Sequence, residues 1–361
     1  MKYKKHFLAR IPNSSIFIFI VTLFFLKVIF YILVKNEIIL PEFVGASDAN
    51  YYHGYVLGHY SSVVNIWPVL LKYLDNYNLY SREVIAYLLF LVSIVLIPII
   101  TCKIAGLKFK VNQKYYLYLW LLCILYPTIY FFTFDVFRDV FMVFCFLIGC
   151  LIVKYLLRTK SSLVFIFLFI VSLIIGWFLA ALRPYLGVAF IGALFLWNIK
   201  FTKKRIVFLS TLYLLALFVA NYAGVFDAIT EYREGFGEIG AGSTLGLNFS
   251  NPILFIPNFI LSFLGQMLGL YITNPLAIVL LLVETVPFFF MLVYVFKNIR
   301  LADNFVRFLI IFFVLYASVW LIGNDNLGTA VRLRIYNYLA VYISFFYILR
   351  LKTQSIREER S

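Results

Sequence analysis

The segment 323–334, which directly precedes the last apolar stretch of the chain, combines the residue types best suited to binding a phosphate. It contains two glycines, a threonine and the candidate ligands Asn324, Asp325, Arg332 and Arg334. Small polar residues before a helix start leave backbone N–H groups available to an anion, and each arginine adds a fork of donors. The segment therefore predicts a substrate-binding site for a diphosphate, although it lacks the lysine of a nucleotide-binding P-loop. The alternative is a polar turn whose arginines contact lipid headgroups.

Two further arginines stand at the ends of apolar stretches. Arg183 lies between two such stretches with almost no loop around it, and Tyr185 follows it closely. A charge at that depth is costly, so the guanidinium must point into protein or into a water-filled cavity. Arg138 and Asp139 begin another apolar stretch. They are candidate substrate-binding residues, and the alternative is an ion pair that caps a helix.

Arg233 lies among acidic residues in a segment, 223–251, that contains several glycines. This composition predicts a mobile loop. A cation on such a loop, above a membrane cavity, would close on a negatively charged substrate and assist catalysis. The alternative is that Glu231 and Glu234 simply neutralise it at the surface.

The first long polar segment, 35–83, holds an acid, two histidines and many aromatic residues, and its length predicts that it is partly helical. Asp48 is the candidate general base of this segment, and His53 and His59 are candidate substrate-binding residues. A carboxylate can accept a hydroxyl proton, while aromatic rings stack on sugar faces. The alternative is that Asp48 caps a surface helix and the tyrosines form an interfacial belt.

The composition indicates that the chain carrying these sites is a polytopic membrane protein. Hydrophobic residues make up 64% of the 361 residues and charged residues only 13%. Apolar runs near the ~20 residues that cross a bilayer recur along the chain. The net charge of +15 is explained by basic cytoplasmic loops, so we expect no nucleic-acid partner. The four cysteines have no metal-ligand spacing, and we predict neither a disulfide nor a cofactor, while the sequence leaves the participation of a divalent metal open.

The distribution of lysine and arginine predicts the orientation. A cytoplasmic N-terminus places most of the basic clusters inside, where such clusters are usually found. These clusters lie at 2–10, 103–114, 154–160, 200–205, 297–307 and 350–360. The polar segments 35–83, 223–276 and 323–334 then fall on the outer, periplasmic face. A function that involves chemistry is therefore expected on that face.

The predicted fold is all-α, a single integral-membrane domain over 1–361 with about ten transmembrane helices and both termini in the cytoplasm. The spans are expected at 14–34, 84–102, 115–133, 139–157, 162–181, 184–199, 206–222, 277–296, 308–322 and 335–350. If the apolar segment 252–272 crossed the membrane, the basic loops that follow it would lie on the outer side instead of in the cytoplasm. That segment is rich in proline and glycine, which predicts a re-entrant or interfacial helix pair.

The combination of these motifs is similar to that of a known family. About ten spans, an acid in the first outer segment, Arg138-Asp139 at a helix head, Arg183 between two helices and the terminal Gly-Asn-x-x-x-Gly-Thr-x-x-Arg-x-Arg string resemble bacterial O-antigen and capsular polysaccharide polymerases. More broadly, they resemble the GT-C membrane glycosyltransferases. The resemblance is architectural over the whole chain and reaches the level of motifs only in these short pieces.

The resemblance implies an enzyme of the bacterial inner membrane that acts on the periplasmic side in lipopolysaccharide or capsule synthesis. Its donor would be a glycan on undecaprenyl diphosphate, and a chain-length regulator would be a further partner. Arg183, Arg332 and Arg334 would bind the diphosphate, Arg233 would assist, and Asp48 would be the general base. The last outer segment is shorter than is usual in these polymerases. This leaves open whether the chain polymerises repeat units or adds a single sugar from a polyprenyl-phosphate donor.

Two other classes remain as alternatives. A flippase or transporter of the same lipid-linked oligosaccharide would also use cationic cavities, but it is expected to show inverted repeats and polar groups near the midplane. A membrane O-acyltransferase has a similar length and number of spans. It would require an essential histidine, for which His53 and His59 are the candidates on the outer side.

Overall fold

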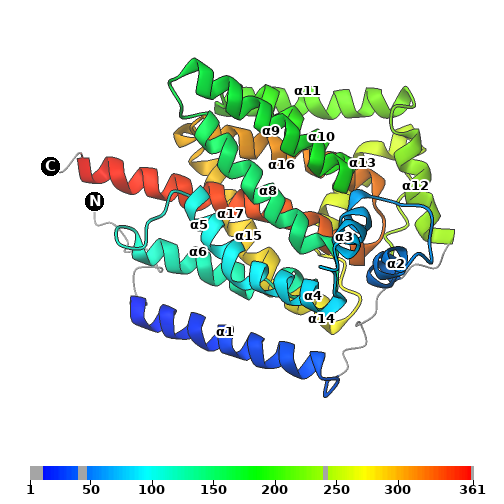
Figure 1. Cartoon of the computed structure of the whole chain (residues 1–361). Coiled ribbons are helices and arrows are strands. Elements are labelled where there is room, and N and C mark those ends of the chain that lie inside the picture. The colour runs from blue at the N-terminus through cyan, green and yellow to red at the C-terminus, as the bar shows by residue number, and fades with distance from the viewer. Residues whose placement is uncertain (1–10, 40–46, 239–242, 359–361) are drawn as a thin grey trace. The chain divides into compact units, whose positions relative to one another are not determined.

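The computed structural model describes residues 11–39, 47–238 and 243–358, and it is helical throughout (Figure 1). The described part of the chain contains no strand, only an isolated antiparallel bridge between Thr244 and Asn326. The predicted all-α class is therefore confirmed. The chain forms two compact units, residues 1–151 and 152–361, and each is described here by itself.

The first unit consists of helices. They are α1 (Asn13–Lys35), α2 (Ser47–Val56), α3 (Ile66–Asn76), α4 (Arg82–Leu91), the π-helical segment η2 (Val92–Leu96), α5 (Ile97–Ile104), α6 (Gln113–Leu125), α7 (Pro127–Phe131) and most of α8 (Arg138–Leu156). Tyr31 stacks on Phe90 and Phe134, with ring centroids 4.2 and 5.5 Å away. The segment 35–83 contains α2 and α3, so it is partly helical, as predicted. Trp67 of α3 connects this segment to the turn before α8, because its indole N–H donates to Val136 O at 2.8 Å.

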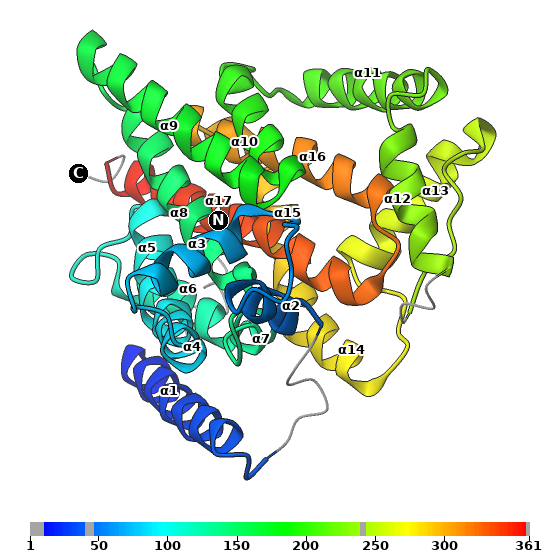
Figure 2. The same cartoon turned by 45° about the vertical axis from the view of Figure 1, so that its right-hand side comes forward.

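The second unit is built around its last helix. Its elements are α9 (Ser162–Leu182), α10 (Pro184–Leu196), α11 (Lys203–Tyr222), α12 (Asp227–Glu238), η3 (Pro252–Leu254), α13 (Phe255–Ser262), η4 (Phe263–Met267), α14 (Pro275–Leu280), η5 (Leu281–Thr285), α15 (Val286–Lys297), η6 (Ile299–Leu301), α16 (Asn304–Gly323) and α17 (Leu327–Glu358). α17 packs against α15 and α16, and α16 packs against α10. Figure 2 shows α12 and α13 beside the end of α16.

Seven helices within the described residues are long and apolar enough to cross a membrane. They are α1, α4 with α5, α8, α9, α11, α14 with α15, and α16. Each is close to the ~20 residues that a bilayer core requires. The chain thus has the features of a multi-pass membrane protein.

The other three predicted spans are also helical, but they differ from the seven in length or composition. The span at 115–133 is divided into α6 and α7 at Pro127, since proline lacks the N–H that would continue the helix. α10 is shorter, and α17 is richer in polar residues. Every residue from 333 to 349 in α17 is buried. This helix therefore exposes little surface to lipid, and its polar residues are compatible with a position inside the protein.

Two segments of the second unit differ from the structure predicted for them, 223–251 and 252–272. The mobile loop expected at 223–251 contains the helix α12, whose first turn carries Asp227, an acid favoured at that end of a helix dipole. At 252–272, where a re-entrant or interfacial helix pair is predicted, one short apolar helix runs from Pro252 to Met267. Its end is the π-helical segment η4, and Gly269 follows with a positive φ of 61°.

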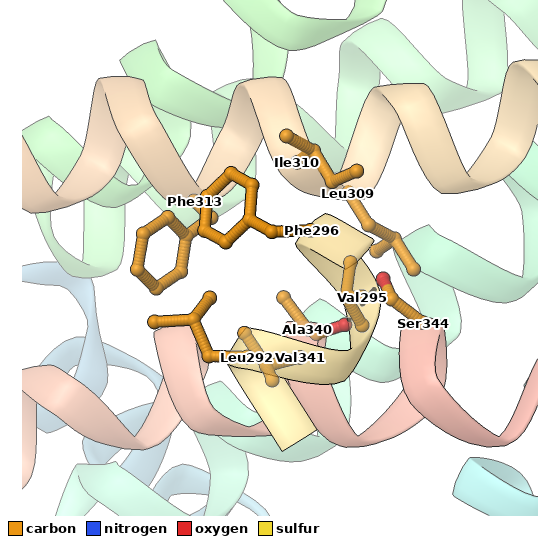
Figure 3. Close-up of a pocket in the computed structure, with 9 residues that line it drawn as sticks. All are labelled: Leu292, Val295, Phe296, Leu309, Ile310, Phe313, Ala340, Val341 and Ser344. Carbon is orange, nitrogen blue, oxygen red and sulfur yellow. Dashed lines mark hydrogen bonds between the residues drawn. The ribbon is translucent and has the colours of Figure 1, made fainter. Parts of the chain in front are cut away.

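Side chains of α15, α16 and α17 surround a small crevice in the core of the second unit (Figure 3). The crevice there has a volume of about 10 Å³, which is roughly the space for one water molecule. It is lined by Leu292, Val295, Phe296, Leu309, Ile310, Phe313, Ala340, Val341 and Ser344. The hydroxyl of Ser344 donates to Ala340 O at 2.7 Å within its own helix. The crevice is therefore a packing gap and offers no site to a substrate.

Gly187 permits the close approach of α9 and α10. A Cβ added there would lie 2.2 Å from Ala180 N and 2.3 Å from Gly176 O, so backbone would have to move. We expect Gly187→Ala to lower the free energy of unfolding by about 1–3 kcal/mol, measured by denaturant titration in detergent. Gly192→Ala is the matched control, because its new Cβ meets only the flexible end of Leu315, at 3.1 Å. Equal stability of the two variants would contradict this account of the helix pair.

Candidate functional site

Arg332 and Arg334 both lie in the first turns of α17, but they face different sides of it. Residues two apart on an α-helix are separated by about 200° around the axis. Arg332 is half-buried, whereas only 2% of Arg334 is exposed. The two arginines, which the sequence suggested would act together, therefore have different surroundings.

Arg334 is held in an ion pair inside the second unit. Its Nη2 donates to Glu284 Oε2 at 3.0 Å, and Glu284 is completely buried. The guanidinium also lies over the ring of Tyr338, 5.3 Å from its centroid. A Cβ on Gly269 would come within 2.8 Å of Arg334 Nη1, so only glycine leaves room here. The charge of Arg334 is thus compensated and enclosed by its own protein.

Two π-helical segments bring polar groups to this side of α17. The segment η5 carries Glu284 and Thr285, and Thr285 Oγ1 lies 2.9 Å from the hydroxyl of Tyr338. That hydroxyl donates in turn to Met267 O, at the end of η4, at 2.6 Å. Such single-turn irregularities occur frequently at functional sites because they redirect side chains out of the regular helical pattern.

Asn324 connects the end of α16 to η4. Its Nδ2 donates to Gln266 Oε1 at 2.5 Å, and Gln266 Nε2 donates back to Asn324 O at 2.7 Å. Both side chains are buried. Asn324 therefore helps to hold the 323–334 segment in place.

Arg233, which lies in α12, binds the C-terminal end of α16. Its Nη2 pairs with Asp325, and its other N–H groups donate to four backbone carbonyls. These belong to Leu247, Leu321, Ile322 and Asn324. The last carbonyls of a helix have no partner within it, so the guanidinium helps to satisfy them, together with Ser262 Oγ, which donates to Leu321 O, and Gln266 Nε2, which donates to Asn324 O.

Burial lowers the pKa of Arg233 to about 10, and the neighbouring Asp325 opposes this shift. The guanidinium is still charged at neutral pH. It lies 4.8 Å from the ring centroid of Phe249, and only 3% of the residue is exposed. In this position Arg233 stabilises the segment that carries the site, and Asp325 is its counter-charge.

The backbone N–H groups at the start of α17 are largely occupied. Leu327 N donates to Ser243 O at 2.9 Å, and Thr329 N donates to the side chain of Asn326 at 2.8 Å. An anion would therefore depend on side chains here more than on the backbone groups that the sequence suggested.

A row of tyrosines runs from Arg183 to Tyr336 of α17. Arg183, at the turn between α9 and α10, is 4% exposed and lies 5.8 Å from the ring centroid of Tyr185. The Tyr185 ring is 6.0 Å from that of Tyr316 in α16, which is 5.5 Å from that of Tyr336 in α17. Tyr336 is one turn after Arg332, on the same face. The second unit thus combines two arginines with aromatic rings, the chemistry expected for a glycan diphosphate.

The predicted residues of the first outer segment lie in the first unit. Asp48 is half-buried in the first turn of α2. His53, in the same helix, has its Nδ1 2.9 Å from the hydroxyl of Tyr80. Burial lowers the pKa of His53, and the nearby Arg82 lowers it further, so this histidine is neutral at pH 7. His59 is exposed after α2. The role of Asp48 as a base stays a prediction.

A polar cluster that sequence reasoning missed stands at the head of α4. Arg82 donates to Asp135 through Nε at 2.8 Å and Nη2 at 2.5 Å, and to Asn50 Oδ1 at 2.7 Å. Asp135 is 4% exposed. The position of Arg82 before an apolar stretch, like that of Arg138, was the available signal.

Arg138 and Asp139 begin α8, where Asp139 is buried and Arg138 is half-buried. Both make interactions within the protein. Among the residues that the structure describes, no three His, Cys, Asp or Glu side chains gather closely enough to hold a metal ion.

Comparison with known proteins adds no assignment to this geometry: no protein-family model, curated protein or solved structure matches the chain.

Proposed function

We propose that the chain is a membrane glycosyltransferase that uses a glycan carried on a polyprenyl diphosphate and polymerises surface-polysaccharide repeat units. The observation that carries the proposal is the row Arg183–Tyr185–Tyr316–Tyr336 leading to Arg332. Arginine forks suit phosphate oxygens, and tyrosine rings suit sugar faces. We place the enzyme in the inner membrane of a bacterium.

The proposed topology has ten spans, including α6 with α7, α10 and α17, and both termini in the cytoplasm. It is supported by the basic residues, which concentrate in the loops assigned to the inner side. The turn at Arg183 and the start of α17 then lie on the periplasmic side. A substrate that has been translocated across the membrane would meet them there.

In the proposed reaction a hydroxyl oxygen of the acceptor glycan bonds to the anomeric carbon of the donor. The bond from that carbon to the diphosphate oxygen breaks, and the lipid diphosphate leaves with the bonding electron pair. Arg183 and Arg332 stabilise the negative charge that develops on this leaving group. The proton of the acceptor hydroxyl passes to a general base.

Arg332→Gln tests the proposal, since this side chain is half-buried and its loss should spare the fold. We expect a host that depends on this variant to lose the long-chain ladder of its surface polysaccharide while it keeps a single repeat unit. The measurement is an electrophoretic profile after complementation of a deletion strain. Arg205→Gln is the matched control, because Arg205 is exposed at the start of α11 and should support a normal ladder. A normal ladder from Arg332→Gln would refute the assignment.

The buried pair Glu284–Arg334 favours one second candidate, a transporter of the same lipid-linked glycan. Ionisable groups enclosed by membrane helices are often part of proton or substrate pathways. The same profile separates the two functions. Loss of even the single repeat unit in the deletion strain would indicate translocation, because an untranslocated unit cannot be attached outside.

A further inference from the structure

A second basic site lies in the second unit, where the turn after α8 meets the start of α16. It is a cavity of about 280 Å³, many times the ~10–15 Å³ that one water molecule needs on the same measure. Its lining residues are Leu157, Arg158, Asp303, Asn304, Phe305 and Arg307. We call it the basic pocket. None of these residues belongs to the row of tyrosines and arginines described above.

The only acid of the basic pocket is already engaged. Asp303 Oδ1 accepts the backbone N–H of Val306 at 3.0 Å and so caps α16. Asp303 Oδ2 accepts the hydroxyl of Tyr347. With both carboxylate oxygens bonded, the acid is a poor ligand for a cation.

The arginines of the pocket are held in defined positions. Arg158 donates to the Tyr347 hydroxyl, and its guanidinium lies 5.6 Å from that ring's centroid. Arg307 donates to Asn304 Oδ1 at 3.2 Å, a contact that uses one N–H of its fork. Arg350 lies on the same tyrosine, 4.6 Å from its centroid. Among the lining residues, two guanidinium groups stand against one carboxylate, which gives the pocket a positive charge, and the start of the α16 dipole adds to it.

A positively charged pocket suits an anionic ligand, and the position of this pocket indicates that the ligand belongs to the membrane. It lies at the ends of α8 and α16, two helices of membrane-spanning length and composition. A site at such helix ends is at the level of lipid headgroups. Leu157 and Phe305 give it apolar walls beside the charges. Basic pockets between membrane helices are a known way of binding anionic headgroups.

We propose that the basic pocket binds the phosphate of an anionic phospholipid headgroup, with Arg158 and Arg307 as its ligands. The face is the one assigned to the cytoplasm, opposite the proposed glycan site. The inference requires only that the chain lies in a membrane, and it does not depend on glycosyl transfer.

The test is the thermal unfolding of the purified full chain in neutral detergent, titrated with short-chain phosphatidylglycerol. We expect a saturable rise in the unfolding midpoint that the matching phosphatidylcholine does not give. In the variant Arg158→Gln/Arg307→Gln the apparent dissociation constant should rise at least tenfold. Arg300→Gln, an exposed arginine outside the pocket, should leave it unchanged.

Three results would overturn the proposal. The first is no difference between the two lipids, and the second is an equal response of the double variant and the Arg300→Gln control. The third is an equal rise with inorganic phosphate at the same concentration, which would assign the pocket to a free phosphate compound. Should the double variant fail to fold, Arg307→Gln alone serves, and its affinity for phosphatidylglycerol must still fall.

Discussion

Replacement of Arg183 by lysine is expected to reduce polysaccharide chain extension by roughly 100-fold or more, nearly as much as replacement by alanine. Arg183 lies at the turn between α9 and α10, with its guanidinium over the ring of Tyr185. Lysine keeps the positive charge but loses the planar fork that can contact two phosphate oxygens and stack on an aromatic ring. If charge alone sufficed, the lysine variant would work.

The measurement is the long-chain fraction of the surface polysaccharide, with the amount of folded protein determined in the same cells. Arg183 is buried, so an unfolded variant must be distinguished from an inactive one. Arg205→Lys is the matched control, an exposed arginine at the start of α11. Near-normal chain extension by Arg183→Lys, at equal amounts of protein, would remove Arg183 from the proposed site.

The helices could be predicted from sequence because length and apolarity are local properties. Each of the ten predicted spans corresponds to helix, including 115–133, which Pro127 divides. The predicted helicity of the first outer segment was also correct, since Asp48 and Asn65 stand where helices begin. The contacts that each helix makes could not be predicted in this way, because they depend on residues far away in the sequence.

The division of roles between Arg332 and Arg334 could not be read from their spacing alone. It depends on which neighbour covers each face of α17. Glu284, 50 positions earlier, comes to lie on one face through η5. Tyr316 of α16 lies on the other face, against Tyr336. A π-helical segment leaves no recognisable pattern in a run of leucine and valine.

Arg233 shows how composition can suggest the opposite of the observed environment. Glycines and acids around it predicted a mobile loop, but the residue lies in α12 and is buried. Its partners at 321–325 are about ninety positions away. Only the fold could reveal that an arginine in a glycine-containing segment satisfies the last carbonyls of another helix.

The large effect expected at Arg233 is therefore on stability. Truncation to alanine would leave Asp325 buried without its counter-charge and would remove one hydrogen bond from each of the three carbonyls that Arg233 contacts at the end of α16. Breaking a buried pair in this way costs about 3–5 kcal/mol of unfolding free energy. We expect denaturant titration of Arg233→Ala in detergent to show a loss of that size, and Asp325→Ala to show a similar one.

The double variant Arg233→Met/Asp325→Leu separates the charge effect from the packing effect. It removes both charges together, so its loss should be clearly smaller than the sum of the two single losses. Glu231→Ala is the control on the same helix, since Glu231 is exposed and its loss should change the free energy of unfolding by less than about 0.5 kcal/mol. If Arg233→Ala were no less stable than this control, the guanidinium would not be holding the end of α16. The prediction from sequence, that Arg233 moves to close on the substrate, would then be favoured again. A residue can move in this way only if the fold does not depend on its contacts.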